Sequence, residues 1–150
     1  LKLIVNRFYN MQERKVTVED CPVITLDKHT HPNGSITVVE NNITLPFEVK
    51  RVFYLYDVPG GEERGGHSHY ELHQFIIAVS GSFDVVIDDG VDRKTVTLNR
   101  PYYGLWVKPG IWSELNNFSS GAVTLVLASG FYDEADYIRD YEDFLKMRNK

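Results

Sequence analysis

Short segments rich in β-branched and aromatic residues follow one another along most of this 150-residue chain, and turn residues separate them. Ser-Gly-Ser at 80–82 lies between two such segments, and Asp-Asp-Gly at 88–90 is a typical hairpin turn. The segments expected to form strands are 36–40, 51–57, 74–79, 83–88, 94–98, 104–108, 111–115 and 123–128. Many short strands at close spacing are typical of an all-β sandwich or jelly roll.

The end of the chain has a different periodicity. Within 133–150, apolar residues recur at near-helical spacing at Ala135, Ile138, Tyr141, Phe144, Leu145 and Met147. Acidic residues begin this segment and basic residues end it, as the helix dipole favours. The pattern predicts one C-terminal helix at about 134–148, packed on a barrel that spans about 21–130.

Length and composition favour a single domain over residues 1–150. No repeat, linker or low-complexity tract divides the chain, and 43% of its residues are hydrophobic and 13% aromatic. A chain of this size buries enough surface to form a core without disulfides or a structural metal.

Charge and residue usage exclude several partners. A net charge of −5 argues against nucleic acid, and no apolar run reaches the roughly 20 residues of a membrane span. Cys21 is the one cysteine, which suits a reducing compartment, and the first five residues (LKLIV) do not resemble a signal peptide. We therefore expect a cytoplasmic protein that binds neither nucleic acid nor a membrane.

Two histidines, His67 and His69, lie two residues apart in a glycine-framed stretch, GEERGGHSHYELHQFIIAVSG, at 61–81. Side chains at i and i+2 of a strand point to the same face. If this face lines the barrel interior, both imidazoles enter one cavity.

This stretch resembles the first cupin motif, in which a glutamate stands where this chain has Gln74. In the region of the second motif, GLWVKPGIWSELNN at 104–117, Trp112 stands where a histidine is expected and Asn116 follows it. The resemblance implies the cupin double-stranded β-helix, a jelly-roll barrel. A cupin metal site uses three histidines and a carboxylate, so we expect neither a metal nor any other cofactor here.

Longer segments resemble the sugar-nucleotide 3,4-ketoisomerases of the cupin superfamily, over about 21–145. They include PFEVKRVFYLYDVPGGEERGGHSH, QFIIAVSGSFDVVIDDG, IWSELNNFSS and ASGFYDEADYIRDYEDFL. The resemblance implies a metal-independent isomerase that moves the keto group of dTDP-4-keto-6-deoxyglucose from C4 to C3 through an enediol. The product, a dTDP-3-keto-6-deoxyhexose, would serve 3-amino sugar and surface glycan (lipopolysaccharide) biosynthesis. The resemblance also implies a homodimer with exchanged N-terminal strands. Ser68 and Tyr70 depart from the residues common in the family.

The reaction needs groups that exchange protons near neutral pH, and we assign this role to His67 and His69. Tyr54 is a candidate for hydrogen bonding to the developing oxyanion, with barrel packing as its alternative. Residues expected to bind the diphosphate or line the pocket are Arg51, Arg64, Gln74, Trp112, Glu114 and Asn116. A surface ion pair remains the alternative for Arg51, and core packing for Trp112.

Three other functions stay open at this point. The first is a sugar-nucleotide 3,5-epimerase, which needs similar acid and base groups. The second is a metal-dependent cupin oxygenase or isomerase, although this chain lacks two of the usual metal ligands. The third is a non-catalytic sensor, which would only bind the sugar nucleotide. The sequence leaves open the configuration of the product at C4. It also leaves open which histidine exchanges a proton with carbon and which with oxygen.

Overall fold

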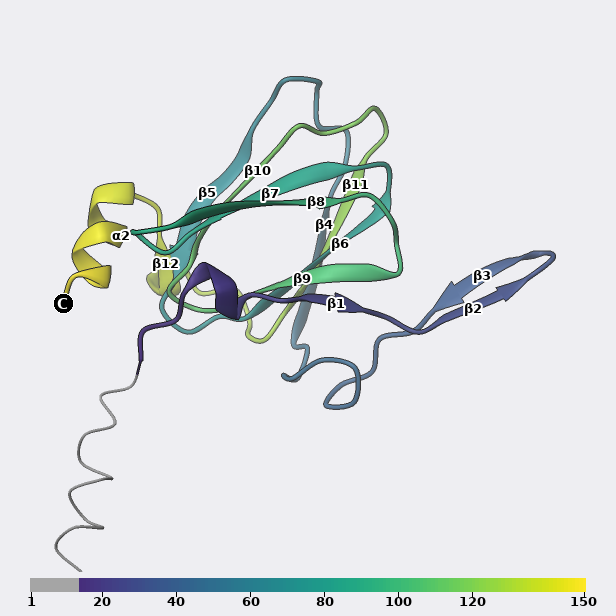
Figure 1. The fold of residues 1–150 in the computed structure, drawn as a ribbon, viewed down its shortest axis with the longest axis horizontal. Coiled ribbons are helices and arrows are strands. Elements are labelled where there is room, and N and C mark those ends of the chain that lie inside the picture. The colour runs from purple at the N-terminus through teal and green to yellow at the C-terminus, as the bar shows by residue number, and fades with distance from the viewer. Residues whose placement is uncertain (1–13) are drawn as a thin grey trace, which may run out of the picture.

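Two five-stranded antiparallel sheets pack face to face in the computed structural model, which describes residues 14–150 (Figure 1). The first sheet has the order β1 (Val23–Thr25), β9 (Tyr103–Val107), β6 (Gln74–Ser80), β11 (Val123–Ala128) and β4 (Arg51–Leu55). The second has the order β12 (Tyr137–Ile138), β5 (Arg64–His69), β10 (Trp112–Asn116), β7 (Phe83–Asp88) and β8 (Arg93–Leu98). Residues 83–88 and 123–128 form strands as predicted, whereas the segment predicted at 36–40 is shifted to β3 (Gly34–Thr37).

The core lies between the two sheets. In β7, Phe83, Val85 and Ile87 alternate inward and are fully buried, and Ile76 and Leu105 face them from the other sheet. Burying such a side chain contributes about 1.5–3 kcal/mol, so the alternation sets which face of each strand turns inward.

A hairpin of β2 (Lys28–His31) and β3 projects from the barrel, at the end opposite the C-terminal helix (Figure 1). Its side chains are largely exposed, and Ile36 is 61% exposed. His29 and His31 lie on β2, with exposed side chains.

The predicted helix at 134–148 is only partly correct. The segment forms a short 3₁₀ helix, η2 (Glu134–Asp136), then β12, and only Tyr141–Arg148 is α-helical (α2). The side chain of Asp133 caps η2 and that of Asp140 caps α2, so two helices start where one was expected. Between them, residues 137 and 138 pair with β5.

The N-terminal residues used to argue against a signal peptide lie outside the described part of the chain. A second 3₁₀ helix, η1 (Val18–Asp20), precedes β1. Within residues 14–150, no helix combines the length and the hydrophobicity needed to cross a membrane.

Candidate active site

A pocket of about 180 Å³ opens between the two sheets. Side chains of alternate residues reach it from β4, β5, β6, β10 and β11, and the segment after η2 forms one wall. The lining residues are Phe53, Leu55, Arg64, Gly65, His67, Gln74, Ile76, Ser113, Leu115, Val126, Tyr137 and Arg139.

His67 lines this pocket opposite Ser113, its partner in the β5–β10 pairing. Burial lowers the pKa of His67 to about 4, neighbouring His69 and Arg139 add to the effect, and a backbone hydrogen bond with Gly65 opposes it. His67 is therefore neutral at pH 7. Its Nε2 is buried and accepts no hydrogen bond from a described residue, so this nitrogen is free to take a proton.

His69 lies behind His67 and does not line the pocket. It is 4% exposed, and the two rings meet edge to face with centroids 4.8 Å apart. The Nδ1 of His69 is 3.0 Å from Oδ2 of Asp136. Burial lowers the pKa of His69, whereas the Asp136 carboxylate raises it in part.

Tyr137 and Arg139 form the wall beside the histidines. The ring of Tyr137 lies 4.3 Å from that of His69 and 5.3 Å from that of His67. The Arg139 guanidinium lies over the Tyr137 ring at 4.2 Å, and Glu134 holds it with contacts of 2.6 and 2.9 Å. The near-helical spacing over 133–150 did not reveal this wall, because the side chains of Asp133 and Asp140 cap two separate helices there.

Of the predicted site residues, the structure brings His67, Arg64 and Gln74 together in the pocket, with His69 directly behind. Arg51 does not line the pocket. Its guanidinium lies 5.3 Å from the Phe53 ring, and its Nε and Nη2 are buried without a partner among the described residues. Its charge nevertheless lowers the pKa of His69, so it belongs to the electrostatic surroundings of the site.

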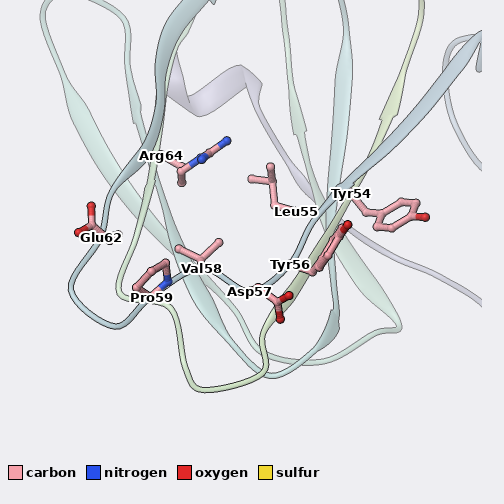
Figure 2. A pocket seen from close by; sticks show the side chains of 8 residues that line it. All are labelled: Tyr54, Leu55, Tyr56, Asp57, Val58, Pro59, Glu62 and Arg64. Carbon is pink, nitrogen blue, oxygen red and sulfur yellow. The ribbon is translucent and has the colours of Figure 1, made fainter.

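Tyr54 does not line this pocket in the chain, and its predicted hydrogen bond to the oxyanion stays a prediction. Side chains alternate along β4, so Phe53 and Leu55 face the pocket and Tyr54 faces outward, where it is 60% exposed. Figure 2 shows Arg64 and Leu55 pointing toward each other across an adjoining hollow, whereas Tyr54 points away.

Trp112, Glu114 and Asn116 lie on the outer face of β10 and do not line the pocket, so their predicted contacts with the substrate stay predictions. Trp112 packs beneath α2, with its ring 5.6 Å from that of Phe144, and its Nε1 donates to Glu114 at 2.9 Å. The intervening residues Ser113 and Leu115 face the pocket instead. Nothing in the sequence pointed to Ser113, which follows Trp112, the residue expected to face the pocket.

The adjoining hollow has a volume of about 360 Å³ and shares Leu55 and Arg64 with the pocket (Figure 2). Its remaining lining residues are Tyr54, Tyr56, Asp57, Val58, Pro59 and Glu62. Arg64 therefore stands at the junction of a small enclosed space and a wider open one.

The pocket suits proton transfer at carbon. A neutral imidazole faces it, and two arginines can stabilise the negative charge that forms when a proton leaves a carbon next to a carbonyl. Within residues 14–150, no three His, Cys, Asp or Glu side chains are grouped so as to hold a metal ion.

Comparisons with known proteins agree with this chemistry. Residues 19–149 match the model of the family described as FdtA, WxcM-like, C-terminal. The TDP-4-oxo-6-deoxy-alpha-D-glucose-3,4-oxoisomerase of Aneurinibacillus thermoaerophilus is 44% identical over 124 residues, which cover 83% of this chain and 89% of that protein.

Two solved structures have a similar fold. A 3,4-ketoisomerase from Helicobacter canadensis is 44% identical, with a TM-score of 0.85 over 87% of this chain and 98% of that one. A mutant of the 3,4-ketoisomerase QdtA from Thermoanaerobacterium thermosaccharolyticum, in complex with TDP-4-keto-6-deoxyglucose, is 35% identical, with a TM-score of 0.86 over 89% and 96%.

Proposed function

This chain belongs to the FdtA family and is a sugar-nucleotide 3,4-ketoisomerase of the cupin fold. We propose that its substrate is dTDP-4-keto-6-deoxyglucose and that His67 transfers the proton in the reaction. The observation that supports this role best is the buried, unpaired Nε2 of a neutral His67 in a pocket that also holds Arg64 and Arg139. In this proposal, one histidine of the pair predicted from the sequence lines the pocket and transfers the proton, and the other lies behind it.

In the proposed reaction, Nε2 of His67 removes the proton from C3, and the C3–H electron pair forms an enediolate with the C4 carbonyl. Arg64 and Arg139 stabilise its negative charge. The imidazolium of His67 returns a proton to C4, and the proton on O3 moves to O4. Among the described residues that line the pocket, Ser113 and Tyr137 carry hydroxyls that can relay this proton.

The shape of the site suggests how the substrate lies. The sugar ring fits the small pocket, where the Gln74 amide can hydrogen-bond its hydroxyls, and the nucleoside occupies the wider hollow. The diphosphate then lies beside Arg64, which lines both spaces and can form charge-assisted contacts with phosphate oxygens. The product, a dTDP-3-keto-6-deoxyhexose, has the carbonyl that an aminotransferase needs to make a 3-amino sugar for a surface glycan.

Proton NMR of the purified protein with dTDP-4-keto-6-deoxyglucose in D₂O tests this function. Because the His67 imidazolium can exchange its proton with solvent before returning it, we expect a 3-keto sugar that carries deuterium at C4. The coupling between H4 and H5 in the product of a parallel reaction in H₂O gives the C4 configuration. Exchange at C3 and C5 without movement of the carbonyl would instead indicate a 3,5-epimerase. Binding without any exchange would indicate a sensor, and loss of turnover after chelation would indicate a metal enzyme.

We propose that the protein acts as a homodimer. Val52 and Tyr54 on the outer face of β4, and Tyr56 just after this strand, expose apolar surface, as Ile36 does on the projecting hairpin. Exposed apolar patches often mark an interaction site, and an exchanged hairpin from a second copy would cover the residues of β4. Light scattering coupled to gel filtration should give twice the chain mass of 17.3 kDa. A mass of one chain at micromolar concentration would contradict the proposal.

We also propose a cytoplasmic location, because Cys21 is buried and free and the proposed substrate is a nucleotide sugar. Fractionation of cells that express the protein should recover it with cytoplasmic markers, and recovery with membranes or the medium would argue against this location.

A further inference from the structure

Asp136 accepts four hydrogen bonds, which hold its carboxylate in one position. Its Oδ1 accepts from the backbone N–H of Glu71 at 2.8 Å, and its Oδ2 accepts from that of Leu72 at 3.2 Å. Its backbone carbonyl accepts from Tyr70 at 3.1 Å. The fourth contact, to His69, therefore comes from a carboxylate with little freedom to move.

This contact determines which nitrogen of His69 carries the proton. An ionised carboxylate only accepts hydrogen bonds, so the Nδ1 of His69 must donate to Asp136. The neutral ring then leaves Nε2 unprotonated. That nitrogen is buried and has no partner among the described residues, and the ring packs edge to face against His67.

The charges around the two histidines make Asp136 distinctive. Arg51 from β4 and Arg139 after β12 both disfavour a protonated His69, and Tyr137 covers the two rings. Among the described residues, Asp136 supplies the negative charge in contact with this group. When His67 accepts the substrate proton, it gains a positive charge close to Arg139, whose own charge is paired with Glu134.

We propose that Asp136 is a positioning residue for the ketoisomerase reaction, which through His69 holds a negative charge behind His67 and stabilises the imidazolium formed during turnover. The inference rests on the proposed role of His67. Asp136 does not touch the substrate. It acts by fixing the tautomer and orientation of His69, and by offsetting the charge that the adjacent ring acquires.

Asp136→Asn removes this charge and keeps one oxygen, which can accept from one of the two backbone N–H groups that donate to the carboxylate. We expect kcat to fall about 10- to 100-fold, with KM changed less than threefold. Loss of the anion lowers the proton affinity of both histidines, so the acidic limb of kcat/KM should move to lower pH. A merely structural role would reduce activity without moving this limb, and that outcome would overturn the proposal.

Asp133→Asn is the matched control. Asp133 lies in the same turn and caps η2 through the N–H of Ala135, without contact to either histidine. We expect it to retain wild-type kcat and the wild-type pH profile. Equal losses in both variants would show that only the turn matters.

A second measurement covers the case in which Asp136→Asn fails to fold. In wild-type protein labelled with ¹⁵N-histidine, the His69 ring should show a protonated Nδ1 and an unprotonated Nε2, assigned by comparison with His69→Asn. The opposite tautomer would overturn the proposal. This NMR result does not depend on turnover, so a protein that showed the expected tautomer but no isomerisation would refute the proposed function alone.

Discussion

Replacing His67 with asparagine is expected to lower kcat about 10²- to 10⁴-fold while dTDP affinity stays within a few-fold of wild type. His67 is the histidine that lines the pocket, and its neutral, unpaired Nε2 is the described group best placed to exchange a proton with carbon. An asparagine of similar size keeps the pocket shape but does not act as a base near pH 7. Turnover followed by NMR and dTDP binding followed by calorimetry measure the two effects separately.

Lys94→Gln is a suitable control, because Lys94 is exposed on β8 and lines neither the pocket nor the adjoining hollow. It should keep near-wild-type activity. If His67→Asn retained more than a tenth of wild-type kcat, another group would have to move the C3 proton, and the assignment of His67 would be wrong.

Replacing Arg64 with alanine is expected to weaken dTDP binding about 10- to 150-fold. Arg64 stands where the sugar pocket meets the wider hollow, and a hydrogen bond to a charged group contributes about 1.5–3 kcal/mol. Arg64→Lys should lie between wild type and Arg64→Ala, because lysine keeps the charge but loses the planar fork that matches phosphate. Calorimetric titration with dTDP gives the dissociation constants.

Arg100→Ala serves as the control for lost positive charge, since Arg100 is exposed in the turn between β8 and β9 and donates a hydrogen bond to the carbonyl of its neighbour Asn99. It should bind dTDP as wild type does. An Arg64→Ala protein that binds dTDP equally well would place the diphosphate elsewhere, with the buried and unpartnered Arg51 as the next residue to test.

The barrel itself was predictable from local patterns. Alternation of apolar residues in 83–88 and 123–128 and the turn residues between strands predicted β7 and β11 at their observed bounds. The i, i+2 spacing of His67 and His69 predicted that they share a face, and they do. These features depend on neighbours along the chain, so the sequence alone contains them.

The orientation of single strands was harder to predict where both faces are covered. In β10, the outer face is buried under α2, so the apolar ring of Trp112 would be buried on either face of the strand. Ser113 takes the position opposite His67. In β4, aromatic residues occupy both faces, and local pattern did not show that Phe53 rather than Tyr54 reaches the pocket.

The family, the reaction class, the strand pattern and the histidine pair follow from residues that are neighbours along the chain. The packing of distant segments brings Asp136, Tyr137 and Arg139 beside the histidines, and Asp136 lies 67 positions from the histidine it contacts. The tertiary structure also decided that His67 faces the pocket while His69 lies behind it. Strand periodicity specifies the direction of a side chain, but which remote segment meets that side chain depends on how both sheets and the C-terminal segment pack together.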